Sequence, residues 1–209
     1  MPMIKNIIFD MDGTLSNTAI ATLASVKEIQ DKYQLPPLAL ETIHRAMGIG
    51  GFGFYKILFP TVPFDTLKKV EAEVDVLEDI KVAEIGRNIL FPDVYEMLVS
   101  LKEKEIRLHI ASTGNPNHVH VTLTTTGIMP FFTTVSCNEP DKIEMVRRMI
   151  GNGNPREWAM VGDMFKDSEA ARANHILSIG ADFGYLSPDD YHLFDRIIYE
   201  PMEIHQVLD

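Results

Sequence analysis

The chain has 209 residues, of which 45% are hydrophobic, so it can build a sizeable buried core. Its 19 lysines and arginines against 30 aspartates and glutamates give a formal net charge of −11. A chain this acidic repels a phosphate backbone or an anionic membrane, which excludes both as general partners. An anionic ligand would therefore have to be recognised locally, through a metal ion or a few cations.

Cysteine content and hydropathy together predict a cytoplasmic protein. Cys137 is the single cysteine, which leaves no partner for an internal disulfide. The N-terminal apolar stretch is shorter than the core of a signal peptide. No window of about 18 residues is apolar and uncharged enough to span a membrane. For the oligomeric state we expect a monomer or a weak homodimer.

Six short apolar runs have the character of buried strands. The first run, 4–9, is rich in β-branched residues and ends at a turn that contains Gly13. The other runs are 106–111, 133–136, 158–161, 176–179 and 196–199. Helical patterns separate most of these runs, and strands that alternate with helices predict an α/β fold whose parallel sheet has helices on both faces.

The segment 16–87 departs from this alternation because it carries helical periodicity and almost no strand signal. Hydrophobic residues recur every three or four positions in 20–33 and in 67–77, a pattern typical of amphipathic helices. We therefore predict a Rossmann-like core domain made of 1–15 and 88–209, with an all-helical domain inserted at 16–87.

Residues 118–126 give conflicting signals. Their valines and threonines favour a strand, whereas Pro116 before them and Gly127 after them are typical of helix ends. Because the segment lies between two strands, we predict a helix. His118 and His120 would point in opposite directions on that helix and would not share a metal ion. We interpret both as surface histidines.

Polar side chains follow the first four predicted strands, at the edge where open α/β sheets bind ligands. They are Asp10, Asp12, Thr14, Ser112, Thr113, Lys142, Asp163 and Asp167. Several carboxylates at one site repel each other unless a cation lies between them, and oxygen ligands of this kind favour Mg²⁺. The sequence therefore predicts a magnesium site at this edge.

Such a set of side chains suits phosphoryl transfer to or from a small phosphorylated metabolite. A metal ion, an amine and a hydroxyl can neutralise the oxygens of the transferring group. One carboxylate can accept that group as an aspartyl phosphate. A second carboxyl group two residues away can protonate the leaving oxygen and then deprotonate the attacking water.

Four motifs in this order resemble the signatures of the haloacid dehalogenase-like hydrolase superfamily. They are FDMDGTL at 9–15, IASTGN at 110–115, Lys142, and VGDMFKD at 161–167. The resemblance covers essentially the whole chain. The helical insert is similar to the cap of the subgroup that contains phosphoglycolate phosphatase and β-phosphoglucomutase.

The resemblance implies a role for each acid of these motifs. Asp10 would be the nucleophile and Asp12 the general acid and base. Mg²⁺ would be held by the carboxylates of Asp10 and Asp163 and by the backbone carbonyl of Asp12. Asp167 would be a further metal ligand or would orient the waters of the metal.

By the same resemblance, Ser112 and Lys142 would bind the oxygens of the phosphoryl group, with help from Thr113 and Thr14. In the insert, Arg45 and Lys56 are the candidates for contacting a charged tail of the substrate.

Three of these assignments keep an alternative. Asp167 is also placed to cap a helix that begins near Ser168, and Ser112 to cap the helix that follows it. Lys166 is the only nearby competitor of Lys142 for the phosphate-binding role.

The function we expect is hydrolysis of a small phosphomonoester, phosphoglycolate-like or a sugar phosphate, by a magnesium-dependent phosphatase. A phosphomutase of the β-phosphoglucomutase type is the first alternative. That type carries a histidine and an arginine at positions that fall on Thr22 and Gly51 here, which weakens this alternative. A non-catalytic binding protein on the same scaffold is disfavoured, because the first motif keeps Asp10 and Asp12 and the last keeps Asp163 and Asp167.

Overall fold

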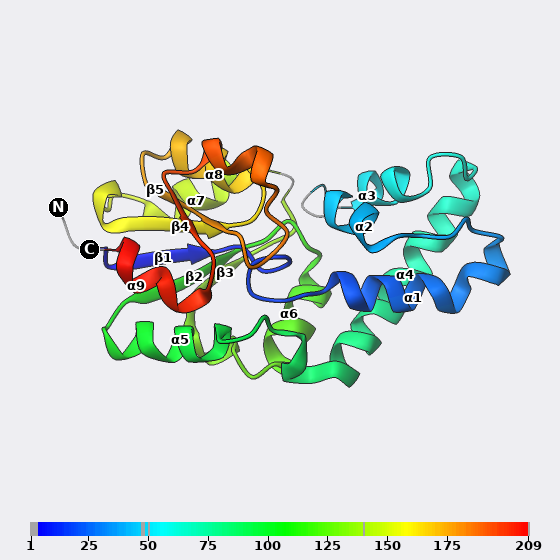
Figure 1. Ribbon diagram of the computed structural model, residues 1–209, viewed down its shortest axis with the longest axis horizontal. Coiled ribbons are helices and arrows are strands. Elements are labelled where there is room, and N and C mark those ends of the chain that lie inside the picture. Colours follow the sequence, from blue (N-terminus) through cyan, green and yellow to red (C-terminus); the bar gives the residue numbers. More distant parts are fainter. Residues whose placement is uncertain (1–3, 47–48, 50, 140, 209) are drawn as a thin grey trace.

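A parallel sheet of six strands forms the centre of the protein in a computed structural model (Figure 1). The structure describes residues 4–46, 49, 51–139 and 141–208, without the side chain of Arg45. The strands are β1 (Asn6–Phe9), β2 (Arg107–Ala111), β3 (Phe132–Ser136), β4 (Trp158–Gly162), β5 (Leu177–Ala181) and β6 (Arg196–Ile198). All six predicted strands are confirmed, with ends that differ by one or two residues.

The spatial order of the strands is β3-β2-β1-β4-β5-β6, and all neighbours are parallel. The order therefore reverses between β1 and β4. Ligands of such sheets bind outside the carboxyl ends of the strands at this reversal. The loops that follow Phe9 and Gly162 are thus the expected place for a site.

Helices cover both faces of the sheet, as predicted. One face carries α5 (Val94–Glu103), α6 (Pro116–Thr125) and α9 (Ile204–Val207), and the other carries α7 (Lys142–Ile150) and α8 (Phe165–Ala173). Ile7 and Phe9 of β1 pack in the hydrophobic cluster of the first face, and Ile8 packs in that of the second. Burial on both faces explains why the strands are continuous apolar runs.

The predicted helix in 118–126 is confirmed as α6. Asn115 caps it, because its side chain accepts a hydrogen bond from the backbone N–H of His118 at 2.9 Å, and Pro116 occupies the first turn. These end signals prevail over the strand propensity of the valines and threonines.

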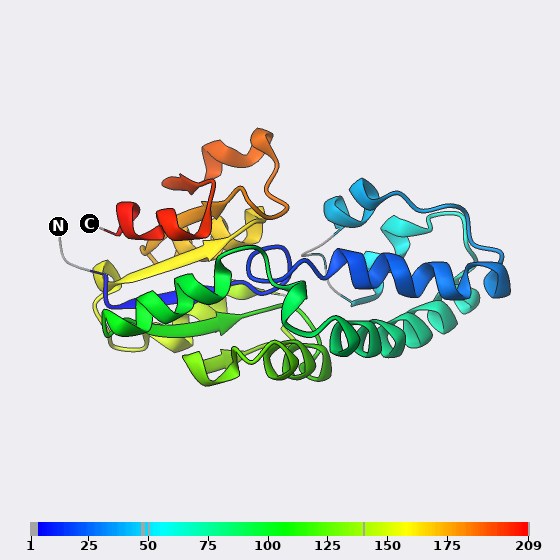
Figure 2. The same ribbon diagram turned by 60° about the horizontal axis from the view of Figure 1, so that its bottom comes forward.

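The segment between β1 and α5 is helical, as predicted. It contains α1 (Ala19–Tyr33), α2 (Leu40–Ala46), α3 (Gly51–Leu58) and α4 (Phe64–Ile85), which we call the helical insert. Its helices share a hydrophobic cluster of their own. They lie beyond the carboxyl ends of the strands (Figures 1 and 2). The domain boundaries at 15/16 and 87/88 stay a prediction.

The two chain crossings between sheet and insert run side by side. The N–H of Asn17 donates to the carbonyl of Ile89 at 2.7 Å, and that of Phe91 donates to the carbonyl of Leu15 at 3.0 Å. Beyond this junction, α4 packs against α6 of the core (Figure 2). The insert therefore contacts the same helix that follows β2.

Short 3-10 helices connect the remaining elements. They are η1 (Gly86–Ile89), η2 (Met129–Phe131), η3 (Pro155–Glu157), η4 (Pro188–Leu193) and η5 (Pro201–Glu203). Within the described part of the chain, no helix combines the length and the apolar character needed to cross a membrane.

Candidate active site

Three carboxylates from the loops after β1 and β4 meet at the carboxyl edge of the sheet. Asp10 follows β1, Asp163 follows β4, and Asp167 lies in the first turn of α8. Each offers an oxygen within 4.8 Å of those of the other two, and all three side chains are buried. The side chain of Asp12 is not in this group; the metal contact expected for Asp12 is its backbone carbonyl.

Lys142, the first residue of α7, is buried against this cluster. Its Nζ atom lies 2.7 Å from Oδ1 of Asp10 and 2.7 Å from Oδ1 of Asp167. Burial opposes the charge of Lys142, but these two carboxylates raise its pKa. Among the described residues, Lys142 and not Lys166 forms the ion pair with Asp10.

The cluster holds more negative charge than Lys142 balances. Burial raises the pKa of Asp10 to about 7; Lys142 lowers this pKa, whereas the charge of Asp167 raises it. The pKa of Asp163 is raised well above its usual range, first by burial and then by the charges of Asp10 and Asp167. A further cation at this position would stabilise all three carboxylates in their ionised form.

The space beside Asp163 fits such a cation. Its Oδ1 accepts a hydrogen bond from the Thr14 hydroxyl at 2.6 Å, whereas its buried Oδ2 has no hydrogen-bond partner among the described residues. Gly13 has a φ of 85°, and a Cβ atom there would lie 2.4 Å from that Oδ2. Carboxylate oxygens in a buried group of this kind are the ligands that Mg²⁺ prefers.

The helix-capping alternative holds for Asp167 and fails for Ser112. Asp167 caps α8, because its Oδ2 accepts the N–H of Met164 at 3.0 Å, while its Oδ1 remains paired with Lys142. The helix begins at Phe165, earlier than the predicted start near Ser168. Ser112 does not cap α6: its Oγ accepts the N–H of Gly114 at 3.0 Å, which leaves its own O–H to donate.

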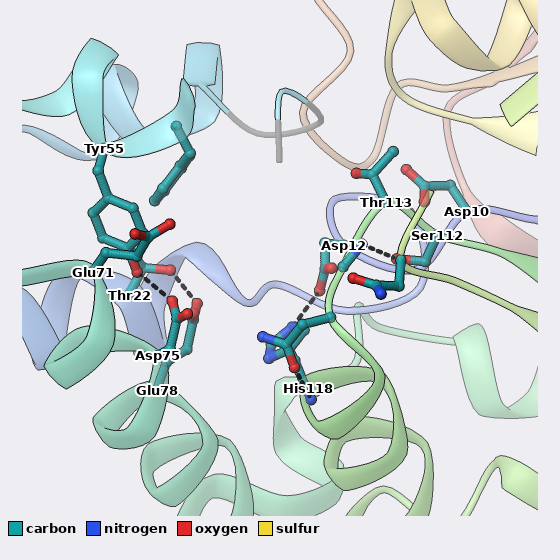
Figure 3. Close-up of a pocket in the computed structure, with 14 residues that line it drawn as sticks. Asp10, Asp12, Thr22, Tyr55, Glu71, Asp75, Glu78, Ser112, Thr113 and His118 are labelled. Carbon is teal, nitrogen blue, oxygen red and sulfur yellow. Dashed lines mark hydrogen bonds and ion pairs between the residues drawn. The ribbon is translucent and has the colours of Figure 1, made fainter. Parts of the chain in front are cut away.

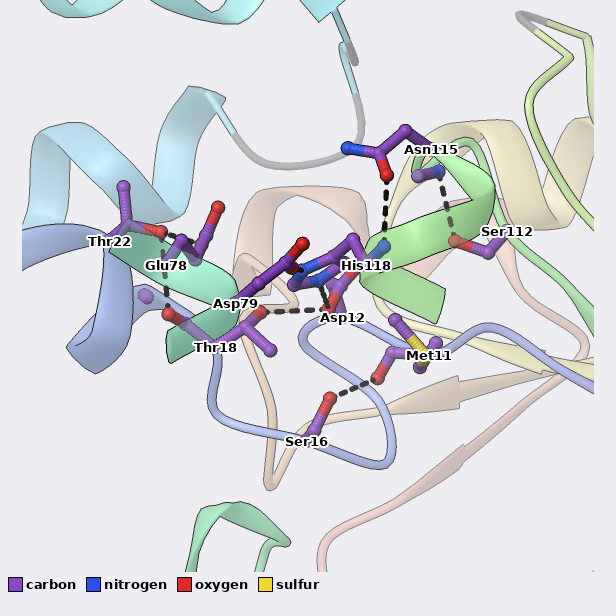
Figure 4. A network of polar contacts seen from close by, with 12 residues as sticks. Met11, Asp12, Ser16, Thr18, Thr22, Glu78, Asp79, Ser112, Asn115 and His118 are labelled. Atoms are coloured by element: carbon purple, nitrogen blue, oxygen red, sulfur yellow. Dashed lines mark hydrogen bonds and ion pairs between the residues drawn. The ribbon is translucent and has the colours of Figure 1, made fainter. Parts of the chain in front are cut away.

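Asp12 is held by hydrogen bonds from two neighbouring segments (Figure 4). Its Oδ1 accepts the Thr18 hydroxyl at 2.9 Å and lies 3.1 Å from Nε2 of His118. Nδ1 of the same imidazole lies 3.2 Å from Oδ1 of Asp79, on α4 of the insert. The expectation that His118 is a surface residue is therefore wrong, whereas His120 is exposed.

The charges of this contact support each other. Burial raises the pKa of Asp12, but the charge and hydrogen bond of His118 and the hydrogen bond of Thr18 lower it by more, so the net pKa lies below the usual range. Burial lowers the pKa of His118, yet Asp12 and Asp79 raise it well above its usual value. Each ring nitrogen lies within hydrogen-bond distance of a carboxylate oxygen, and an imidazolium can donate from both nitrogens.

A cavity of about 310 Å³ opens between the sheet edge and the insert (Figure 3). On the sheet side its lining contains Asp10, Asp12, Ser112 and Thr113. The nucleophile and the acid/base expected from the sequence thus face the same space. The predicted contact of Thr14 is different, since its hydroxyl supports Asp163.

On the insert side the cavity is lined by acids of α4, namely Glu71, Asp75 and Glu78. Asp75 accepts the Tyr55 hydroxyl at 2.6 Å, Glu78 accepts the hydroxyl of Thr22, and Glu71 pairs with Lys68. Burial raises the pKa of Glu78 to about 7.

These acids are not among the residues predicted for the site, although their spacing of four and then three residues predicts a shared helix face. The residues predicted for the insert side are the cations Arg45 and Lys56. Lys56 is exposed, with its Nζ 5.2 Å from the Phe52 ring centroid, and does not line this cavity. The side chain of Arg45 lies outside the described residues. Among those residues, the cavity lining includes no lysine or arginine.

The sequence matches one family model and several curated proteins over most of its length. The family model of the haloacid dehalogenase-like hydrolases matches residues 7–181. Pyrophosphatase PpaX of Bacillus pumilus is 26% identical over 178 residues, which cover 81% of this chain and 79% of that protein. Phosphoglycolate phosphatase of Agrobacterium fabrum is 26% identical over 200 residues, covering 88% and 83%.

Solved structures share the fold over the full chain. The crystal structure of a predicted phosphoglycolate phosphatase from Haemophilus somnus superimposes with a TM-score of 0.89 at 22% identity, covering 100% of both chains. A β-phosphoglucomutase from Clostridium difficile gives a TM-score of 0.78 at 17% identity, covering 99% of this chain and 97% of that one. From the family match over most of its length, together with this fold, the chain belongs to the haloacid dehalogenase-like hydrolases and is an enzyme of that family.

Proposed function

We propose that the protein is a Mg²⁺-dependent phosphatase that hydrolyses a small phosphomonoester through an aspartyl phosphate on Asp10. One observation carries this proposal. The carboxylate of Asp10 is paired with Lys142 and grouped with Asp163 and Asp167, and it also faces a cavity that contains Asp12. A nucleophile, a proton carrier and a cation site thus share one small space.

In the first half of the reaction, a carboxylate oxygen of Asp10 attacks phosphorus and the bond to the leaving oxygen breaks. Asp12, in its protonated form, gives that oxygen its proton. In the second half, Asp12 takes a proton from a water molecule, whose oxygen attacks the phosphorus of the aspartyl phosphate. Phosphate leaves, and the carboxylate of Asp10 is restored.

The remaining residues of the site balance charge. Lys142 and the hydroxyl of Ser112 bind oxygens of the phosphoryl group, with Thr113 beside them. The carboxylates of Asp10, Asp163 and Asp167 and the backbone carbonyl of Asp12 would hold Mg²⁺. When bound, the metal ion supplies positive charge next to the phosphoryl oxygens.

The acids of α4 favour a leaving group without negative charge. A carboxylate, as in phosphoglycolate, or a second phosphate, as in pyrophosphate, would lie against Asp75 and Glu78. The described lining of this cavity offers no lysine or arginine, and its histidine, His118, is already paired with Asp12 and Asp79. Charge repulsion in a partly buried space disfavours both. Hydroxyl groups can instead donate to these carboxylates, so of the expected substrate classes we propose a sugar phosphate.

The same lining supports hydrolysis over a mutase reaction. A phosphomutase must hold a second phosphate at the far end of its cavity, where this chain has carboxylates. The hydroxyl of Thr22, at one of the two positions that weakened the mutase alternative, is engaged by Glu78. We also propose that residues 16–87 act as a cap that closes over the cavity and excludes water.

The test is Mg²⁺-dependent phosphate release from a panel that contains sugar phosphates, phosphoethanolamine, phosphoglycolate and pyrophosphate. Asp10→Asn serves as the blank. We expect release from sugar phosphates by the wild type and none by the variant. Equal release from both proteins, or none from either, would refute the phosphatase proposal. An isomeric sugar phosphate without free phosphate would favour the mutase.

The leaving-group proposal has its own test. The double variant Asp75→Asn, Glu78→Gln should raise kcat/KM for phosphoglycolate relative to phosphoethanolamine by about tenfold, because the acidic groups that repel the carboxylate of phosphoglycolate are removed. Glu84→Gln is the matched control, since Glu84 is exposed on the same helix. A wild type that prefers phosphoglycolate would refute the leaving-group proposal and leave the phosphatase proposal standing.

A further inference from the structure

The cavity contains one contact between core and insert that the reaction outlined above does not use. His118 stands between two carboxylates, Asp12 of the core and Asp79 of the insert (Figure 4). Its ring nitrogens lie 3.1 Å and 3.2 Å from the nearest oxygens of these acids. The side chain is only 9% exposed, and the backbone N–H of His118 donates to the side chain of Asn115.

We propose that His118 is a positioning residue for Asp12 in the second half of the reaction, and that Asp79 of the insert holds the imidazole in place. This proposal rests on the proposed function. It assigns the line Asp12–His118–Asp79 a role in hydrolysis of the aspartyl phosphate, in which Asp12 accepts a proton from water.

The hydrogen bonds to Asp12 select which of its oxygens can act. Both described donors, the Thr18 hydroxyl and Nε2 of His118, point at Oδ1. No hydrogen bond occupies Oδ2 among the described residues, and Asp12 lines the cavity. Two donors on one oxygen fix the plane of the carboxylate and leave Oδ2 to accept the proton of the attacking water.

Asp79 makes this arrangement dependent on the insert. It belongs to α4, and its carboxylate is also held by the side-chain amide of Asn117 on α6. Helices α4 and α6 pack against each other (Figure 2). A movement of α4 away from the core would remove one carboxylate from His118 and loosen the ring that orients Asp12.

Kinetics with p-nitrophenyl phosphate distinguish a positioning role of His118 from a merely structural one. Nitrophenolate leaves phosphorus without a proton, so p-nitrophenyl phosphate can phosphorylate Asp10 without acid from Asp12. Hydrolysis of the aspartyl phosphate still needs a base. If His118 serves that step, its loss slows turnover and leaves the formation of the intermediate nearly unchanged.

The experiment is rapid-mixing kinetics with p-nitrophenyl phosphate and Mg²⁺ on the full chain, followed by intact-mass measurement. For His118→Ala we expect a burst of nitrophenolate close to one per active site. Steady-state kcat should fall about 10–100-fold, as for other groups that orient a reacting side chain. The value of kcat/KM should change less than about threefold, and a phosphorylated Asp10 should accumulate.

Three variants complete the test. His118→Gln keeps an amide donor and should recover part of kcat, and Asp79→Asn should give a smaller burst of the same kind. His120→Gln, an exposed histidine on the same helix, should behave as wild type. Comparison of burst with turnover in one preparation is independent of the folded fraction, so partial unfolding of His118→Ala does not obscure the result.

Two results would overturn the proposal. If kcat and kcat/KM fall together in His118→Ala without a burst, the contact is structural. If neither falls, the contact is not used. Failure of the proposed function looks different, because the wild type itself would then release no nitrophenolate in a manner that depends on Asp10.

Discussion

Between about pH 8 and about pH 5, His109 should lower the free energy of unfolding by about 2 kcal/mol, and the substitution His109→Leu should abolish this part of the pH dependence. His109 lies in the middle of β2 with 5% of its surface exposed, and neither ring nitrogen has a hydrogen-bond partner among the described residues. The centroid of its ring lies 5.0 Å from the ring centroid of Trp158. The imidazole is therefore buried in an environment that disfavours its charged form.

The magnitude follows from the pKa of this group. Burial, together with the charges of Arg107 and Lys102, lowers the pKa of His109 from 6.5 to about 4. In the unfolded chain the His109 imidazole binds a proton below pH 6.5, whereas in the folded chain it does so only near pH 4. The stability contribution of the neutral imidazole is therefore complete above pH 6.5 and is lost as the pH falls towards 4. At about pH 5 the difference in proton binding corresponds to about 2 kcal/mol.

Urea unfolding at both pH values measures the effect. Carboxylates that titrate in the same range contribute equally to wild type and variant, so the difference between their pH dependences isolates His109. In His109→Leu the free energy of unfolding should be nearly unchanged or higher at pH of about 8, because two unpartnered nitrogens are removed. His120→Gln, an exposed substitution, is the control. Equal pH dependence in wild type and His109→Leu would refute the reasoning.

Other predictions concern the carboxylate cluster. Lys142→Ala should abolish activity and lower the free energy of unfolding by about 3–5 kcal/mol, measured in urea, because Asp10 and Asp167 lose their buried partner. Gly13→Ala should weaken Mg²⁺ binding at least about tenfold in calorimetry, since its Cβ would lie 2.4 Å from the Asp163 carboxylate. Mg²⁺ at about 100 times its Kd should stabilise the fold by about 2.7 kcal/mol, reversibly with chelator; Asp163→Asn should lose this effect.

The sheet could be predicted because its signal is local. Strands buried on both faces are short apolar runs, and the acids that follow β1 and β4 stand next to those runs in the sequence. The helix α6 was predictable for the same reason, since Pro116 and Gly127 mark its ends despite a strand-forming composition; its cap, Asn115, is seen only in the structure. Lys142 was found by its position between motifs, and the ion pairs with Asp10 and Asp167 agree with that choice.

The contact of His118 could not be predicted, because its partners are distant in the sequence. Asp12 lies 106 positions away and Asp79 lies 39 positions away, and only the packing of α4 on α6 brings them together. The helix geometry that separates His118 from His120 was right: one faces inward and the other outward. The prediction that both lie at the surface is wrong for His118, because helix geometry gives the angle between two side chains and not which of them faces the core.

The proposed chemistry is divided between the edge of the sheet and the helical insert. Asp10, Lys142, Asp163 and Asp167 are fixed at the edge of a buried sheet and by two helices that pack on it, so substitutions there should abolish phosphoryl transfer altogether. The contacts of Asp12 and the lining that faces the leaving group depend on the insert, through Asp79 and the acids of α4. Substitutions on α4 should therefore change which substrates react and how fast the intermediate is hydrolysed, while the nucleophile keeps its place.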